Sequence, residues 1–275
     1  MAGIFSIPDE MWERIEPLVP EHVNTHRFGG GRPRVPDRRV MDGIFFVLRT
    51  GCQWRALDGT GICSGSTAHD RFQEWERAGF FDALWEQALR DYEEEVGIDW
   101  SWLSIDGSMG KSPLGGGKTG PNPTDRGKLG SKRSVMCEAA GIPVGLATEG
   151  ANRNDCKLAE ATIQSVPVKR PQPTAEHPQG VCLDKAYDHE FIRDLLKDLD
   201  FTPHIRSRGE EAKELREDLG HRARRWVVER IHSWINRYRG LLIRWSKKDE
   251  NHDALLKFSL ALITWQQMGV MGISG

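Results

Sequence analysis

Three acidic residues stand where a carboxylate could do chemistry. Asp106 ends the run "WLSID" and Asp184 ends the run "VCLD", so each directly follows a segment typical of a buried strand. Open α/β sheets place ligands at the carboxyl ends of their strands, so we expect both acids at one edge of a sheet, adjacent if their strands are neighbours. A helix returning across that edge could add Glu229. Three carboxylates would form the hard oxygen site that suits Mg²⁺ or Mn²⁺.

Glu229 is notable because it is isolated among basic residues. Residues 221–248 hold nine Lys or Arg and this single acid. Three neighbouring anions repel one another unless cations neutralise them. Two metal ions about 3.5–4 Å apart would do so, and would also activate an attacking oxygen and stabilise the leaving oxygen in phosphodiester cleavage. Any one of the 40 acids taken alone is more simply a solvated charge or a helix cap, so this hypothesis depends on the three together.

Several basic residues could contact DNA phosphates. The Gly-rich segment 108–133 reads either as a solvated loop or as a phosphate-contacting loop near the metal site, and "GGGRPRVP" reads either as a plain linker or as an arm for the minor groove. The arginine-rich segment around Glu229 is the third candidate. The DNA-binding candidates are Arg32, Arg34, Lys111, Lys118, Arg126, Lys128, Lys132, Arg133, Arg222, Arg225, Arg230 and Arg237.

The elements that must position these groups form an α/β pattern. The first 95 residues read as helices, with a helix ending at Gly51 and a break at Gly79. From Trp100 the pattern changes to strands, with "SVMCEAA" and "IPVGLATEG" as a hairpin about Gly141. "DCKLAEATIQS" and "HEFIRDLLKDL" are helices between strands, which favours a mixed sheet flanked by helices.

Two helices should close the chain. Apolar residues from Val227 to Trp245 recur at helical spacing and predict a helix over 221–245, with Glu229 opposite the apolar stripe. A further apolar helix is expected over 252–268. Trp226 lies off the stripe and could stack on an unpaired base, although core packing is the simpler interpretation.

Length and composition bound the rest. The 275 residues suffice for two domains, which we place at 1–98 and 99–275. The five cysteines form no C-x-x-C pair, which favours reduced thiols in a cytoplasm. We recognise neither a secretory leader nor an apolar run of membrane-spanning length, so a soluble, cytoplasmic protein with no membrane partner is expected.

Taken together, the motifs resemble a known family. "SIDGS", "LDKAYD" and "VVERIHSWINRYR" occur in this order, as in the DDE transposases of bacterial insertion sequences, specifically the fifth family within the broader fourth-family group. "GIPVGLATEGANRNDCKL", "GIFFVLRTGCQWRAL" and "FQEWERAGFFDALW" extend the resemblance over most of the chain. One departure concerns the wider group's Y-(2)-R-(3)-E-(6)-K signature. Here its Tyr and Lys positions hold Arg222 and Asn236, while Arg225 and Glu229 match.

The resemblance implies a fold and an activity. It implies an RNase H-like catalytic domain after a helical N-terminal domain that binds DNA ends, with Asp106, Asp184 and Glu229 as catalytic, metal-binding residues for two Mg²⁺ or Mn²⁺ ions. It further implies binding of terminal inverted repeats in double-stranded DNA, cleavage, and joining of 3′ hydroxyl ends to target DNA by a homodimer or higher synaptic assembly. Two alternatives are an RNase H-like nuclease without strand transfer and a non-enzymatic DNA-binding regulator derived from a transposase.

Overall fold

The N-terminal part of the chain is helical. The computed structural model describes residues 5–23, 33–205 and 226–270. Its first helices are α1 (Asp9–Ile15), α2 (Asp37–Thr50), α3 (Gly65–Arg77) and α4 (Phe80–Glu95), with 3₁₀ turns at Glu16–Leu18 and Trp54–Gly59. The expected helix boundaries at Gly51 and Gly79 are confirmed. Both residues have positive φ, 70° and 74°, which glycine adopts without the strain of a side chain.

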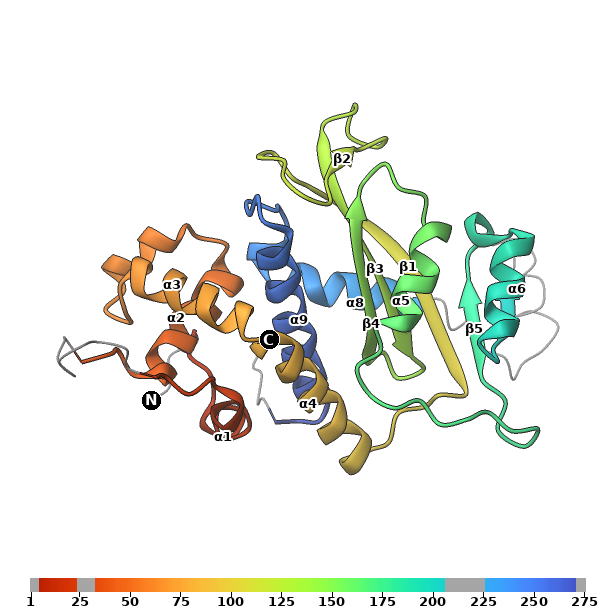
Figure 1. Ribbon diagram of the computed structural model, residues 1–275, viewed down its shortest axis with the longest axis horizontal. Coiled ribbons are helices and arrows are strands. Elements are labelled where there is room, and N and C mark those ends of the chain that lie inside the picture. Colours follow the sequence, from red (N-terminus) through yellow and green to blue (C-terminus); the bar gives the residue numbers. More distant parts are fainter. Residues whose placement is uncertain (1–4, 24–32, 206–225, 271–275) are drawn as a thin grey trace.

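A mixed sheet follows these helices (Figure 1). Its strands among the described residues are β1 (Trp102–Lys111), β2 (Gly120–Pro121), β3 (Leu129–Glu138), β4 (Pro143–Gly150), β5 (Gly180–Leu183) and β6 (Thr202–Ile205). The order is β2-β3-β1-β5-β6, with β4 paired to β3. β1, β3 and β4 are antiparallel neighbours, whereas β5 is parallel to both β1 and β6. The expected mixed sheet and the hairpin about Gly141 are confirmed.

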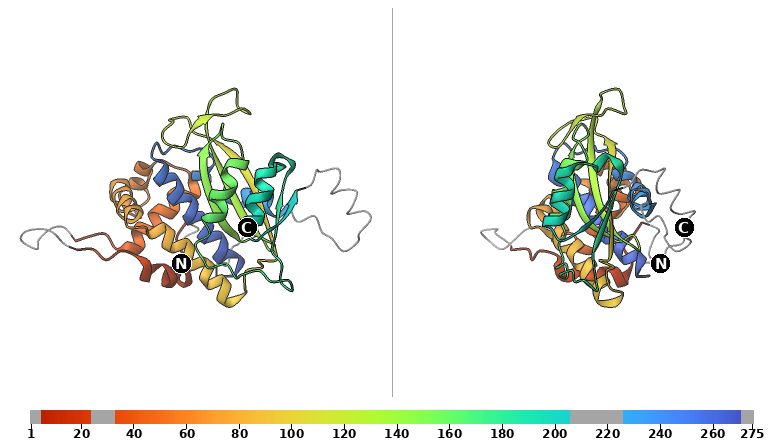
Figure 2. Two further views of the ribbon diagram at one scale, coloured as in Figure 1. Left: turned by 45° about the vertical axis from the view of Figure 1, so that its right-hand side comes forward. Right: turned by 90° about the vertical axis from the view of Figure 1, so that its right-hand side faces the viewer.

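Helices cover both faces of this sheet. They are α5 (Cys156–Gln164), α6 (Glu190–Asp198) and α8 (Trp226–Asn236), followed by α9 (Asp249–Gln267). α5 packs on β3 and β4, while α8 packs on β1 and β3. Figure 2 shows α6 and α8 on opposite sides of the sheet. Side chains alternate along a strand, so consecutive residues of β1 face these two layers in turn.

The last helix joins the sheet to the N-terminal helices. α9 lies between them and packs on α4, α8 and β4 (Figure 1). Phe258 of α9 is fully buried, with its ring centroid 6.4 Å from that of Phe45 and 6.0 Å from that of Phe81. One apolar core therefore runs through both halves of the chain, and the division at residue 98 stays a prediction. None of the described helices is long and apolar enough to cross a membrane.

The helix predicted over 221–245 was too long at its C-terminal end. α8 ends at Asn236, a 3₁₀ turn follows at Arg239–Leu241, and the chain then bridges to β1. A Cβ on Gly240 would lie 3.0 Å from the backbone oxygen of Leu48 in α2. The helix thus ends near the point where the chain passes close to α2. The spacing of apolar residues cannot predict this end, because it depends on a contact between segments far apart in the sequence.

The interpretation of residues 108–133 as one loop was also wrong. β1 continues to Lys111 and β3 begins at Leu129, so both ends of the segment belong to the sheet. Asp106 consequently lies inside β1 rather than at its end. The physical reason is the antiparallel pairing with β3, which prolongs β1 beyond the point where β5 stops.

Candidate active site

Asp106 and Asp184 lie on neighbouring strands at the same level. β1 pairs with β5 in parallel over residues 102–104 and 180–182. Continuing this register by two residues places Asp106 beside Asp184, and adjacent strands are about 4.8 Å apart. The sequence had left open whether the two strands are neighbours, and the structure shows that they are. The pair lies where the parallel ladder ends and the chain leaves β5.

The carboxylate of Asp184 is held by the backbone that follows it. It accepts a 2.8 Å hydrogen bond from the backbone N–H of Ala186, which caps the 3₁₀ turn Lys185–Tyr187. No Lys, Arg or His side chain of the described residues lies within ion-pair distance of it. A carboxylate that lacks a nearby cationic side chain fits a role as a cation ligand in charge and in donor type.

Negative charge accumulates around one buried phenol beside this pair. Burial raises the pKa of Tyr187 well above its usual range, and the carboxylates of Asp155, Asp106 and Asp184 raise it further. The Tyr187 hydroxyl has no hydrogen-bond partner among the described residues. The phenol therefore stays neutral. Because Asp106, Asp184 and Asp155 all raise its pKa, the three carboxylates lie near the same buried side chain.

Helix α8 brings a histidine to Asp106. Nε2 of His232 lies 3.8 Å from Oδ2 of Asp106, and the imidazole is 8% exposed. Burial and, to a smaller extent, the charge of Arg133 lower the pKa of His232 to about 3, while interaction with the Asp106 backbone acts in the opposite direction. His232 is thus neutral at pH 7. No sequence motif pointed to His232, although its place three residues after Glu229 was a usable signal.

Glu229 is carried on the same side of α8 as His232, one turn earlier. Its side chain is exposed. Across the described residues, no three His, Cys, Asp or Glu side chains lie close enough together to hold one metal ion. The structure therefore brings two acids to adjacent strands and places the third on the helix packed against β1, without closing the three into a cluster.

Contacts on the opposite face of β1 explain why position 107 is a glycine. A Cβ at this position would lie 2.1 Å from Oδ1 of Asp155, so the strand tolerates no side chain there. Asp155 forms a 3.0 Å ion pair with Lys132, and Lys132 also donates to the backbone oxygen of Arg153 at 2.7 Å. The ammonium group of Lys132 is thus buried and occupied on the α5 side of the sheet.

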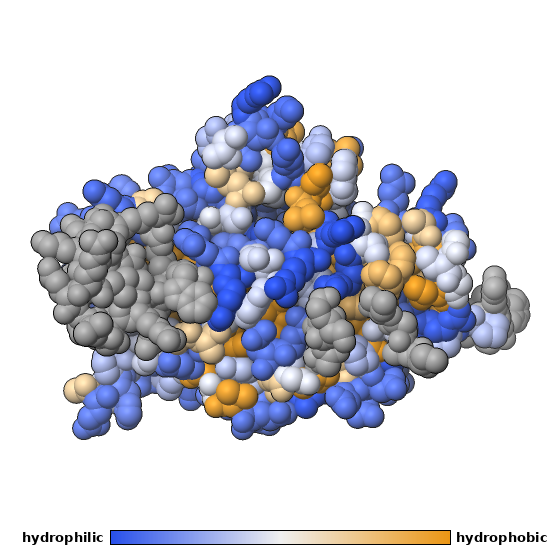
Figure 3. All heavy atoms as spheres, turned by 180° about the vertical axis from the view of Figure 1, so that it is seen from behind, coloured by the Kyte–Doolittle hydropathy of each residue, from blue (hydrophilic) through white to orange (hydrophobic). Residues whose placement is uncertain are grey.

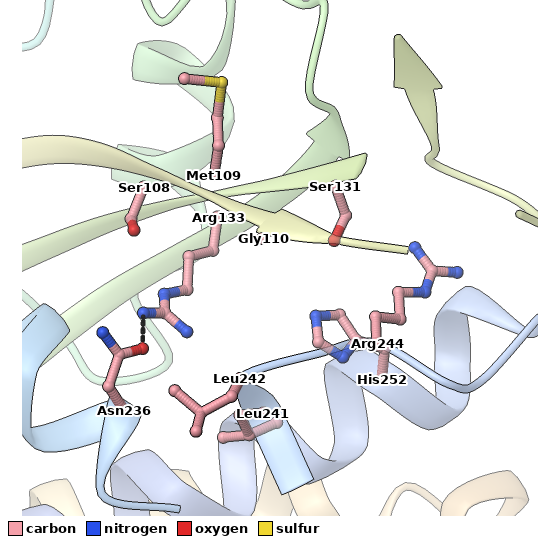
Figure 4. A pocket seen from close by; sticks show the side chains of 10 residues that line it. All are labelled: Ser108, Met109, Gly110, Ser131, Arg133, Asn236, Leu241, Leu242, Arg244 and His252. Carbon is pink, nitrogen blue, oxygen red and sulfur yellow. Dashed lines mark hydrogen bonds between the residues drawn. The ribbon is translucent and has the colours of Figure 1, made fainter. Parts of the chain in front are cut away.

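Arg133 faces the α8 side and reaches Asn236. Nη2 of Arg133 donates a 2.7 Å hydrogen bond to Oδ1 of Asn236, which occupies the Lys position of the wider group's signature (Figure 4). Burial lowers the pKa of Arg133 to about 10, a value at which the guanidinium remains charged at neutral pH. Arg133, from a distant strand, is the residue that contacts position 236.

The remaining DNA-binding candidates fall into distinct groups. Lys111, Lys118, Arg126 and Lys128 are exposed around β2, and Arg237 is exposed just past the end of α8. Within this group Lys118 is paired with Asp253 at 2.8 Å and Lys111 with Asp125 at 3.7 Å. Arg34 is paired with Glu74 at 3.0 Å, while Arg230 donates to the backbone oxygen of Ala140 in the hairpin turn. Arg32, Arg222 and Arg225, and the side chain of Trp226, lie outside the described residues. The face seen in Figure 3 is largely hydrophilic, with apolar side chains in small groups.

Sequence comparison decides the family. Residues 98–263, more than half of the chain, match the family described as "Transposase DDE domain", and residues 7–85 match "Putative transposase of IS4/5 family". The chain belongs to the DDE transposases. The resemblance inferred from its motifs is confirmed, and the chain is an insertion-sequence transposase, an enzyme that cleaves DNA and transfers strands. Membership of this family also implies the use of a divalent metal.

One curated relative agrees with this assignment. The transposase is 37% identical over 154 residues to a Burkholderia cepacia protein named "Putative transposase for insertion sequence element IS402", a match that spans 55% of this chain and 70% of that protein. Among solved structures, the catalytic domain of Mos1 mariner transposase is 12% identical with a TM-score of 0.28, covering 61% of this chain and 91% of that chain. The piggyBac transposase synaptic complex is 10% identical with a TM-score of 0.44, covering 98% and 76%.

Proposed function

We propose that this transposase binds the terminal inverted repeats of its own element as double-stranded DNA and cuts them with Asp106, Asp184 and Glu229 as the metal-binding residues. It then joins the freed 3′ hydroxyl to target DNA, working as a homodimer or a higher synaptic assembly. Because its substrate is the cell's own DNA, we place this activity in the cytoplasm.

The observation that carries the proposal is the parallel pairing of β1, which carries Asp106, with β5, which leads directly into Asp184. Two carboxylates in this relation attract a divalent cation, and the packing of α8 on β1 brings the helix that carries Glu229 toward them. Two bound Mg²⁺ or Mn²⁺ ions would supply the charge that activates the attacking oxygen and stabilises the leaving oxygen.

The chain's own residues orient this site. Gly107 lets β1 pass against Asp155, and the Ala186 N–H fixes one oxygen of Asp184. His232 contributes bulk without positive charge beside Asp106, so it does not compete with a metal cation. Exposed Lys111, Lys118, Arg126 and Lys128 around β2, together with Arg237, are the residues proposed to contact DNA phosphates.

The test compares three near-isosteric variants, Asp106→Asn, Asp184→Asn and Glu229→Gln, on a labelled duplex carrying one end of the element. Each should lose Mg²⁺-dependent cleavage while retaining DNA binding. Cleavage retained in all three would contradict the proposed site. A second assay with precut ends separates the alternatives, because a nuclease yields no joined product and a regulator neither cuts nor joins.

A further inference from the structure

A cavity of about 140 Å³ lies beside the proposed active site, between the sheet and the segment that links α8 to α9 (Figure 4). Its polar and charged lining comes from β1, β3 and this C-terminal region: Ser108, Ser131, Arg133, Asn236, Arg244 and His252. None of its described lining residues is acidic. The cavity therefore gathers positive charge without an internal counter-ion.

Arg133 is a buried cationic group of this cavity that has no carboxylate partner among the described residues. Its side chain is 8% exposed, and its Nε has no hydrogen-bond partner among the described residues. The bonds it does make go to neutral oxygens, Oδ1 of Asn236 and the backbone oxygen of His232. Burying an arginine without a carboxylate is costly unless an anion completes the site.

The other basic groups of the cavity are already fixed. Arg244 donates to the backbone oxygens of Ser246, Gly117, Lys118 and Lys247, which holds its guanidinium in place. The carboxylates of Asp253, Asp249 and Glu250, which do not line the cavity, also act on this guanidinium. His252 is 7% exposed, and no described side chain is hydrogen-bonded to its ring. The cavity is thus a preformed, positively charged recess rather than a flexible surface of lysines.

The recess lies along the strand from the proposed metal site. Ser108 follows Asp106 by two residues on the same face of β1, a step of about 6.6 Å, and is the cross-strand partner of Arg133. Asn236 follows Glu229 by two turns on the same side of α8. A DNA strand whose reacting phosphate lies at the carboxylates would bring a neighbouring phosphate over the recess.

We propose that this recess is an oxyanion site, in which Arg133 binds the backbone phosphate next to the one that reacts. The inference rests on the proposed function, since it places the recess beside the cleaved bond. The ligand chemistry is a phosphate oxyanion. Its source is the phosphodiester of bound DNA rather than free inorganic phosphate.

The experiment measures DNA binding without cleavage. Full-length protein in EDTA is titrated against a labelled duplex carrying one end of the element, over a range of salt concentrations. The logarithm of the DNA-binding constant falls linearly with the logarithm of the salt concentration, and losing one phosphate contact should make this negative slope shallower by about 0.9. Arg133→Met should show this change, and Arg133→Lys a smaller one. The matched control is Arg170→Met, which removes a half-buried arginine bonded to Gln179 and the Leu199 backbone, away from the recess.

A second pair of variants covers the case in which Arg133→Met fails to fold. Ser108→Glu places a carboxylate in the recess opposite Arg133, whereas Ser108→Gln adds similar bulk without charge. The proposal predicts a reduced salt slope for the Glu variant and a smaller change for the Gln variant. Unchanged slopes in folded Arg133→Met, or equal effects of Glu and Gln, would overturn it. So would thermal stabilisation of wild type by inorganic phosphate, lost in Arg133→Met, with no change in DNA binding. Because no metal is present, failure of the proposed triad would leave these readouts intact.

Discussion

Nε2 of His232 lies 3.8 Å from Oδ2 of Asp106, with the imidazole neutral because it is buried. This relationship places an uncharged group from α8 beside an acid of the sheet. A permanent cation at the same position would pair with Asp106 and oppose metal binding.

The first prediction follows from that contact. His232→Lys should raise the Mg²⁺ concentration required for half-maximal cleavage, because an ammonium group would compete for the Asp106 carboxylate. His232→Gln keeps the position neutral and should raise it less. Equal Mg²⁺ requirements for the Lys variant and wild type would show that His232 is not close enough to matter.

The second prediction concerns the other face of β1. Gly107→Ala should lower the free energy of unfolding by about 1–3 kcal/mol, because the new methyl group overlaps Asp155. Urea denaturation measures this change. Gly110→Ala is the matched control on the same strand, since a Cβ there meets nothing within 4 Å. Similar losses for both variants would contradict the steric account.

The third prediction tests the continuity of the core. Phe258→Ala should cost about 3–5 kcal/mol, because its ring is fully buried between α2 and α4. The wild-type chain should unfold in one calorimetric transition shifted as a whole by this change. Phe191→Ala, at a side chain 54% exposed, is the control. Two transitions, with only one displaced, would instead support independent domains at 1–98 and 99–275.

The fourth prediction is a pH dependence. Burial, together with the charges of Arg244, Arg133 and Lys118, lowers the pKa of His252 from 6.5 to about 3. Between these values the unfolded chain binds a proton that the folded chain excludes, so this group makes stability fall on acidification below about pH 6.5. The slope is at most about 1.4 kcal/mol per pH unit.

His252→Gln removes this titration. Between pH 7 and pH 5, wild type should therefore lose about 2 kcal/mol more than the variant, as measured by urea denaturation. His177→Gln changes an exposed histidine and should follow wild type. Parallel curves for wild type and His252→Gln would show that His252 is not held neutral.

Local sequence signals were sufficient for much of the fold. Gly51, Gly79 and Gly141 mark turns through their backbone freedom. The strands that lead to Asp106 and Asp184 are parallel neighbours, although β1 continues past Asp106 to Lys111. The end of α8 was not predictable, since it depends on the contact of Gly240 with α2.

The recess could not be predicted from the sequence either. It combines residues between Ser108 and His252 through strand pairing and the turn after α8, and no spacing links them. Arg133 could be proposed as basic, but its burial against Asn236 depends on the register of β1 and β3.

Replacement of Asp184 by cysteine tests metal binding most directly. A thiolate is a softer ligand than a carboxylate and suits Mg²⁺ poorly, whereas Mn²⁺ tolerates it better. We predict that Asp184→Cys binds the DNA end and is inactive with Mg²⁺, and that Mn²⁺ restores a measurable part of its cleavage. Asp184→Ala should stay inactive with both metals. Cleavage by Asp184→Cys that is as fast with Mg²⁺ as that of wild type would contradict the assignment of Asp184 as a metal ligand.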